Sequence, residues 1–93
     1  MKLDLEFFTK ALGFTKTTYK ILNYMLDRPR EQVTSVMITK DLGIVQSHVS
    51  ASMKVLKERG WVTSGPQGYN LVKEPDEIRG AIQKEYEEKL ERV

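Results

Sequence analysis

Apolar residues recur at intervals of three and four along much of this chain, which is the spacing of one face of an α-helix. Leu5, Phe8 and Leu12 form the first such series. Thr15 is a suitable N-cap for the next series, and Pro29 prevents that helix from continuing. Five helices are predicted in this way, over about residues 4–12, 15–27, 35–42 and 46–59 and from residue 75 onward. Either Thr34 or Ser35 can cap the third of them.

The helix predicted over residues 46–59 has two unlike faces. Val49, Met53 and Leu56 form an apolar stripe that the body of a protein can bury. The opposite face carries mainly short polar or basic side chains. Because Gly43 ends the preceding helix, the sequence predicts two helices joined by a tight turn.

Two β-prone runs follow, over residues 61–63 and 69–72. Residues 64–68 between them contain the glycines and the proline of a hairpin turn. Residues 32–34 form a further short extended segment in this prediction. The predicted fold class is therefore mainly α with a small β-hairpin (α+β).

The last predicted helix has Pro75 in its first turn and an apolar residue at every fourth position. A helix that extends beyond so small a domain has little left to cover, so we expect its stripe to contact a second copy of the chain. The first helix joins it in this prediction. The predicted dimerisation residues are Leu5, Phe8, Leu12, Ile78, Ile82, Tyr86 and Leu90.

The amino-acid composition limits the kinds of functional site that the chain can form. Cysteine is absent and His48 is the only histidine, so we expect no disulfide, no metal and no cofactor. No nucleophile motif or acid–base pair points to an enzyme. No apolar run reaches the ~18 residues that span a bilayer, and an acid near the start is atypical of a signal peptide, so we expect a cytoplasmic protein.

Charge is divided unevenly along the chain. Residues 1–73 hold 11 Lys and Arg against 6 Asp and Glu, whereas residues 74–93 hold 4 against 7. The overall charge of +2 thus consists of a net +5 followed by a net −3. A polyanion would bind the basic part, and the acidic end would be kept away from it.

The two helices on either side of Gly43 have the pattern needed to enter the major groove of DNA, where one face is buried and the other presents short polar and basic groups. Gln46 suits adenine, Lys54 suits guanine or a phosphate, and the small Ala51 allows a close approach. The candidate DNA-binding residues are Lys16, Ser35, Lys40, Gln46, Ser47, His48, Ser50, Ala51, Lys54, Lys57, Gln67 and Tyr69.

Two of these candidates have an alternative interpretation. His48 either donates to a phosphate or is simply solvated, as most histidines in the first turn of a surface helix are. Tyr69 either covers the base of the hairpin or reaches a phosphate with its hydroxyl group. We assign phosphate contacts to Lys16, Lys40, Lys54 and Lys57, and base contacts to Gln46, Ser47 and Ser50.

Four short motifs, Leu42-Gly43, Gln46-Ser47, Leu56 and Gly60-Trp61-Val62, follow one another at a defined spacing. In this pattern the segment resembles the recognition half of winged helix-turn-helix regulators of the multiple-antibiotic-resistance, phenolic-acid and archaeal sugar-regulator groups (MarR, PadR and TrmB). Leu12-Gly13-Phe14-Thr15 and Tyr19 are similar to the opening of the sugar-regulator group, so the resemblance covers about residues 11–73. It implies DNA binding and a twofold interface built from the terminal helices. Unlike many of these regulators, the chain has no Lys or Arg at the hairpin tip.

The length of the chain and its flanking helices also resemble the centromere-binding adaptors of archaeal plasmid partition. That resemblance implies DNA binding in plasmid segregation, with a Walker-type motor in the partner system.

These observations predict one winged-helix domain over residues 1–93, with an N-terminal helix (1–13), a winged-helix core (14–73) and a C-terminal dimerisation helix (74–93). We expect it to bind a roughly palindromic double-stranded DNA site as a homodimer on the nucleoid or a plasmid. It would act as a transcriptional regulator or as a partition adaptor, with a partition protein as a further partner in the second case. The alternative is a winged-helix module that binds a protein partner.

Overall fold

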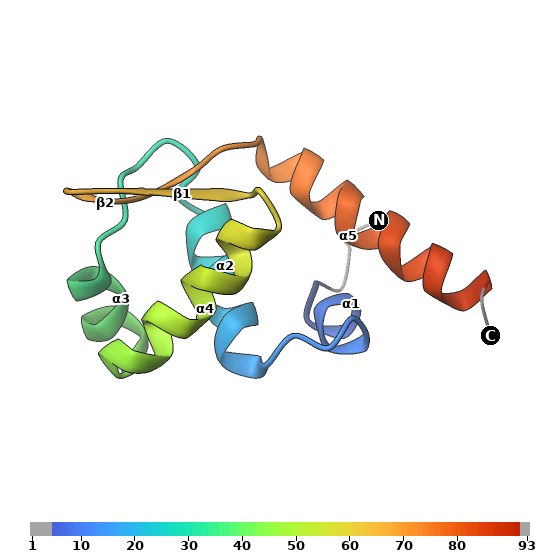
Figure 1. Cartoon of the computed structure of the whole chain (residues 1–93), viewed down its shortest axis with the longest axis horizontal. Coiled ribbons are helices and arrows are strands. Elements are labelled where there is room, and N and C mark those ends of the chain that lie inside the picture. Colours follow the sequence, from blue (N-terminus) through green and yellow to red (C-terminus); the bar gives the residue numbers. More distant parts are fainter. Residues whose placement is uncertain (1–4, 92–93) are drawn as a thin grey trace.

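The computed structural model describes residues 5–91, which form five helices and one antiparallel hairpin (Figure 1). The elements are α1 (Leu5–Ala11), α2 (Lys16–Leu26), α3 (Ser35–Leu42), α4 (Gln46–Glu58), β1 (Val62–Gly65), β2 (Gly68–Leu71) and α5 (Pro75–Glu91). The predicted fold class, mainly α with a small β-hairpin, is confirmed, and the predicted helix start at Asp4 lies outside the described residues. None of these helices is both long and apolar enough to cross a membrane.

Two threonines fix where α2 and α3 begin. The side-chain oxygen of Thr15 accepts a hydrogen bond of 3.1 Å from the backbone N–H of Thr18. The side-chain oxygen of Thr34 accepts one of the same length from the N–H of Met37. Each bond satisfies an N–H that the first turn of a helix leaves without an internal partner. The predicted cap at Thr15 is confirmed, and Thr34 rather than Ser35 caps α3.

The core of the molecule surrounds α2, which contacts α1, α3, α4 and β2. Its buried apolar residues are Leu5, Ile21, Leu22, Tyr24, Met25, Leu26, Val33, Ile38, Val49, Met53, Leu56, Trp61, Val62, Ile78 and Ile82. All five helices and the hairpin contribute to this set, so each element loses apolar surface to the same interior. Within residues 5–91, no buried side-chain nitrogen or oxygen lacks a hydrogen-bond partner.

The hairpin of β1 and β2 is tighter than the sequence indicated. Strand pairing extends to Gly65 and Gly68, so only Pro66 and Gln67 remain in the turn. The predicted loop over residues 64–68 is therefore too long, because its outer residues are paired as strand. Neither Pro66 nor Gln67 has a positive φ, so this two-residue turn is not of the primed types that most hairpins of this length use.

The extended segment predicted around Val33 joins the hairpin through a single bridge. The N–H of Val33 donates to the carbonyl of Tyr69 at 2.9 Å, and the N–H of Tyr69 donates to the carbonyl of Val33 at 2.7 Å. Gly68 has a φ of +139°, and a Cβ at this position would lie 2.8 Å from the carbonyl oxygen of Val33. Glycine therefore permits the close approach that fastens the hairpin to the segment before α3.

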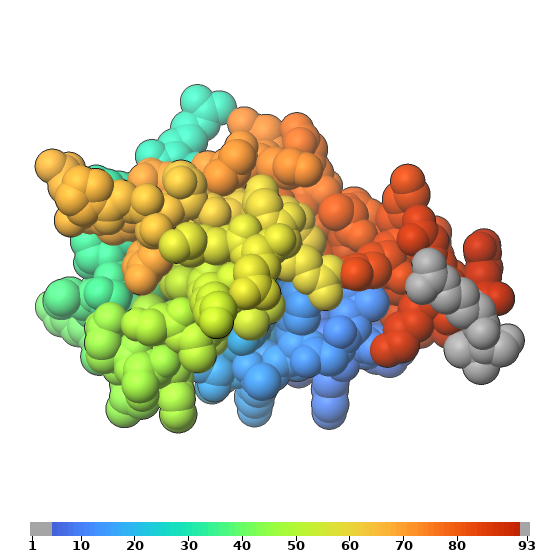
Figure 2. All heavy atoms as spheres, viewed as in Figure 1, coloured from blue at the N-terminus to red at the C-terminus, as the bar shows by residue number. Residues whose placement is uncertain are grey.

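α5 begins in the core and ends outside it. Ile78 and Ile82 have no exposed surface, whereas the second half of the helix projects from the body at the end opposite the hairpin turn (Figure 2). The prediction that Leu5, Ile78 and Ile82 contact a partner is wrong, because the chain's own core encloses these side chains. The segment of residues 14–73 does not complete its core alone, and α1 and α5 close it.

We expect Gly68→Ala to lower the free energy of unfolding by about 1–3 kcal/mol, because the new Cβ would collide with the Val33 carbonyl at a strained φ. Gly65→Ala is the matched control, since it lies opposite Gly68 in the same hairpin and a Cβ there meets no atom within 4 Å. Urea denaturation measures both variants. Equal losses would contradict the close approach at Gly68.

Candidate nucleic-acid interface

α3 and α4 are joined by a turn of three residues that Gly43 makes possible. Gly43 has a φ of +67°, in the left-handed region, and its N–H donates to the carbonyl of Thr39 at 3.0 Å. Val45 lies just before α4, and its carbonyl accepts from the N–H groups of His48 and Val49 at 3.0 and 3.1 Å. The two helices therefore meet at a fixed angle, with α4 on the outside of the molecule (Figure 1).

The two faces of α4 are oriented as the sequence predicted. Val49, Met53 and Leu56 are at most 1% exposed and belong to the core. The candidate residues of the opposite face are all exposed to solvent: Gln46, Ser47, His48, Ser50, Ala51, Lys54 and Lys57. Residues 46–57 include no Asp or Glu, so this face carries only neutral and basic groups before Glu58. Its orientation is confirmed, and its function stays a prediction.

A buried polar contact between α2 and α4 was not predicted. The Thr18 hydroxyl donates to the Ser52 hydroxyl at 3.1 Å, and both side chains are only 4% exposed. A hydrogen bond at one defined point resists rotation and sliding of α4 on α2, which apolar contacts alone do not. The spacing of Ser52 from Val49 and Leu56 places it on the inward face and could have revealed it.

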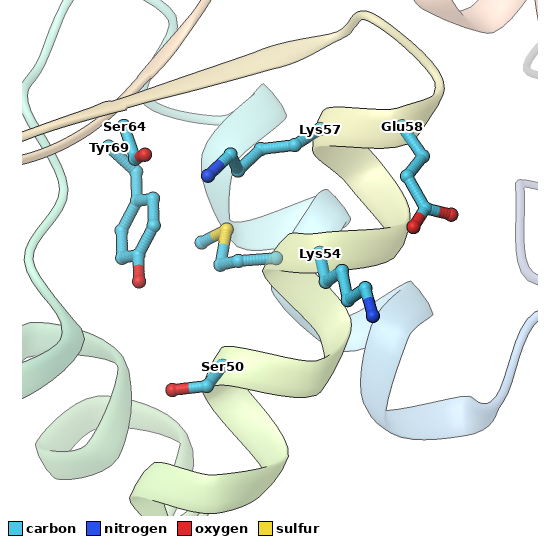
Figure 3. Close-up of a pocket in the computed structure, with 7 residues that line it drawn as sticks. Ser50, Lys54, Lys57, Glu58, Ser64 and Tyr69 are labelled. Carbon is cyan, nitrogen blue, oxygen red and sulfur yellow. The ribbon is translucent and has the colours of Figure 1, made fainter.

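A groove of about 320 Å³ lies between α4 and the hairpin. Its lining residues are Ser50, Met53, Lys54, Lys57, Glu58, Ser64 and Tyr69. Figure 3 shows the ring of Tyr69 extending from the hairpin into this space, with Lys57 directed toward the hairpin and Ser50 below. The structure thus brings Tyr69 together with the α4 candidates. Ser64 was missed, because the sequence assigned it to a loop.

The remaining candidates lie apart from this groove. Lys16 is exposed at the start of α2 and lines a separate hollow of about 210 Å³ between α1 and α2. Lys40 is exposed on α3, and Ser35 is half-buried at its first position. Gln67 is exposed in the hairpin turn. These four residues lie on α2, on α3 and in the hairpin turn, and none of them lines the groove beside α4.

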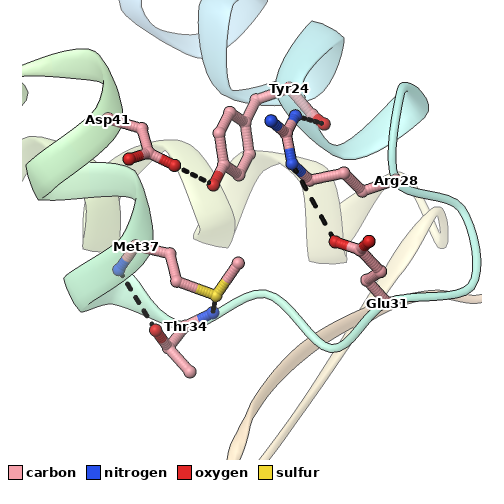
Figure 4. A network of polar contacts seen from close by, with 6 residues as sticks. All are labelled: Tyr24, Arg28, Glu31, Thr34, Met37 and Asp41. Carbon is pink, nitrogen blue, oxygen red and sulfur yellow. Dashed lines mark hydrogen bonds and ion pairs between the residues drawn. The ribbon is translucent and has the colours of Figure 1, made fainter.

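A polar network holds the end of α3 against α2 (Figure 4). The Tyr24 hydroxyl donates to Asp41 at 2.6 Å, and the Arg28 guanidinium lies 3.8 Å from the centroid of the Tyr24 ring. Arg28 also donates to the Tyr24 carbonyl at 3.1 Å. The hydrogen bond to Asp41, followed by burial, raises the pKa of Tyr24 above its ordinary value of 10.0. This network fixes the helix that precedes the turn into α4.

Arg59 connects the end of α4 to α5. Its guanidinium forms an ion pair with Glu85 and lies 4.9 Å from the centroid of the Phe14 ring and 5.7 Å from that of Trp61. A cation over aromatic rings and beside a carboxylate is held in one position more firmly than by either contact alone. The side chain of Arg59 therefore connects α4 to α5.

At the projecting end, α1 and α5 share an aromatic cluster. The rings of Phe7, Phe8 and Tyr86 meet edge to face, with centroids 4.9–5.6 Å apart. Phe7 is 52% exposed, and Leu90, one turn beyond Tyr86, is 55% exposed. We call Phe7, Phe8, Tyr86 and Leu90 the end patch. Of the predicted dimerisation residues, Phe8, Leu12, Tyr86 and Leu90 retain exposed surface.

Within the described part of the chain, no three His, Cys, Asp or Glu residues are grouped so that they could hold a metal ion. Comparisons with family models, with curated proteins and with solved structures each gave no match.

The stability of the protein should depend on Tyr24 above pH 10. The folded state holds the phenol proton more tightly than the unfolded state, so this contribution is complete below about pH 10 and is lost as the pH rises through the folded pKa. We expect Tyr24→Phe to cost about 1–2 kcal/mol at pH 7, because the bond to Asp41 is lost. The difference should shrink above pH 10.

Urea denaturation of both chains between pH 7 and 11 measures this difference. Subtracting the two curves removes the titration of the other tyrosines and the lysines. A difference that stays constant across the range would contradict the raised pKa.

Proposed function

We propose that this chain is a winged-helix protein that binds double-stranded DNA, with α4 as its recognition helix and the β1–β2 hairpin as its wing. The observation that carries the proposal is the division of α4. One face is buried in the core, and the other is solvent-exposed, carries mainly short polar or basic side chains, and has no Asp or Glu over residues 46–57. A helix that enters the major groove needs this combination, because it must approach both base edges and phosphates.

The surroundings of α4 fit the same role. The groove beside the hairpin places Lys57 and Tyr69 next to the exposed face, where a phosphate of the DNA backbone would lie. α4 also begins without a side-chain cap, which leaves the positive end of its dipole open to an anion. Phosphate contacts are assigned to Lys16, Ser35, Lys40, His48, Lys54, Lys57 and Tyr69, and a wing contact to Gln67.

We further propose that the protein acts as a homodimer through the end patch. The patch combines exposed aromatic and aliphatic surface at the end of the molecule that lies away from the hairpin. A twofold contact there would leave both copies of α4 free to reach successive major grooves on one side of the duplex. The acidic excess of α5 would face away from the phosphates. A roughly palindromic site follows from this symmetry.

In the cell, such a dimer would serve as a transcriptional regulator or as a partition adaptor on the nucleoid or a plasmid. Footprinting on genomic and plasmid fragments separates these two roles. A short protected palindrome beside a promoter indicates a regulator, and protection that spreads outward as protein is added indicates a partition adaptor. The exposed side chains of α4 include no Trp, Tyr or Phe, and its exposed apolar residues are Ala51 and Val55, which suits base edges better than a protein hot spot.

Two substitutions on α4 should have different effects on DNA binding. Lys54→Ala should weaken binding to all duplexes and lower the slope of log K against log salt concentration by about one, because one phosphate contact is lost. Gln46→Ala should instead reduce discrimination between the preferred site and other duplexes by about 1–3 kcal/mol. Lys84→Ala is the matched control, since it removes an exposed lysine from α5. Fluorescence anisotropy at several salt concentrations measures each effect.

If the first two variants both bind as the unmodified protein does, α4 is not the recognition helix. If the protein shows no salt-dependent affinity for any duplex, the proposal of DNA binding fails.

Leu90→Asp should convert the dimer to a monomer without unfolding it, because the side chain is 55% exposed and lies in the end patch. Burying the new carboxylate at a subunit contact is unfavourable. Val36→Asp, on a 72% exposed residue of α3, should leave the dimer intact. Light scattering after size-exclusion chromatography gives the mass of each. An unmodified protein that is monomeric, or a Leu90→Asp protein that is still dimeric, would contradict the assigned interface.

A further inference from the structure

The start of α4 departs from the usual chemistry of a helix start. Val45 occupies the N-cap position, forms no side-chain hydrogen bond to the helix and is 55% exposed. A hydroxyl, amide or carboxylate side chain normally stands here because it satisfies a backbone N–H. An exposed branched apolar residue gives up that bond and leaves apolar surface in water. Local rules are broken in this way mainly where a site needs the side chain.

The first two turns of α4 lack the side chains that read guanine best. Arg and Lys are the usual readers of guanine in the major groove, and residues 46–51 contain neither. Gln46 has the amide that pairs with the N6 and N7 edge of adenine. Ser47 and Ser50 can bond to any base pair. The first basic residue of the helix is Lys54, beyond the N-terminal part that normally contacts base edges.

A second small apolar group lies in the middle of the exposed face. Ala51 is exposed and follows Ser47 by one turn of the helix, on the side opposite the buried stripe. The only apolar group that a base presents in the major groove is the C5-methyl group of thymine. An exposed Val at the tip of the helix and an exposed Ala on its outer face are both complementary to that methyl group.

We infer that α4 selects half-sites rich in A·T pairs, with Gln46 on adenine and with Val45 and Ala51 against thymine methyl groups. This inference rests on the proposed function and names the class of DNA sequence that it requires. Lys54 and Lys57 then neutralise phosphates and carry no sequence preference.

The test starts from duplexes selected by the protein out of a random pool. The selected half-sites should have a core of A·T pairs. The best duplex is then resynthesised with each thymine replaced in turn by uracil, which removes the methyl group and keeps the base pairing. We expect affinity to fall about fourfold at each position where a methyl group is buried.

Two variants assign the contacts. Val45→Ala should abolish the uracil effect at one position, and Ala51→Ser should abolish it at another. Val36→Ala is the matched control, because it shortens an exposed valine on α3 and should keep the full uracil effect. Melting temperatures confirm that the variants are folded.

The other possible results contradict different parts of the proposal. Selected half-sites with G·C cores, or equal affinity for thymine and uracil duplexes, would overturn the inference and leave DNA binding intact. A uracil effect that persists in both variants would overturn the roles of Val45 and Ala51. If the pool yields no bound duplex, both the inference and the proposed function fail.

Discussion

The burial of one face of α4 against α2 is the constraint on which the rest of the molecule depends. Val49, Met53 and Leu56 share a core with Ile21 and Leu22 of α2. The hydrogen bond between Thr18 and Ser52 adds a directional contact to this apolar interface. Apolar contacts hold α4 because they remove apolar surface from water. The hydrogen bond between the two hydroxyl groups fixes the rotation of α4 about its own axis and its position along α2. Since the inward face is fixed, the outward face is fixed as well, and every candidate base contact derives its position from this packing.

The elements around α4 extend that surface in two directions. On one side, the bridge between Val33 and Tyr69 fastens the hairpin to the segment before α3, and the groove lies between this hairpin and α4. On the other side, Arg59 links the end of α4 to α5 through Glu85, and its guanidinium also lies over the ring of Phe14, which precedes α2. A subunit contact at the end patch would therefore involve α5, which Arg59 already connects to α4. Proposed DNA binding and proposed dimerisation are thus connected by packed side chains and do not need a flexible linker.

The charge distribution follows the same arrangement in space. The net positive residues 1–73 contain α4 and its neighbours, and the acidic excess lies on α5. The second half of α5 projects from the end of the molecule away from the hairpin, so its acids are separated from the surface that would face a polyanion (Figure 1): Glu85, Glu87, Glu88 and Glu91. Long-range attraction of this kind increases the rate of encounter, while short-range groups on α4 decide which bases are accepted. Because the hairpin tip carries no Lys or Arg, the positive charge of the groove comes from Lys54 and Lys57 of α4.

The sequence by itself determined where the helices lie, which face of α4 is apolar and that a hairpin follows, because local periodicity, caps and turn residues encode these features. It did not determine that strand pairing extends to Gly65 and Gly68, or that the distant Val33 lies against Gly68 and pairs with Tyr69. The sequence also led to the wrong assignment of Ile78 and Ile82 to a subunit interface. An apolar stripe shows that one face of a helix is buried, but it does not show whether the same chain or a partner buries it. Only the tertiary structure decided that the covering is the chain's own core. The physical reason is that periodicity is a local property, whereas burial depends on which segments meet in space.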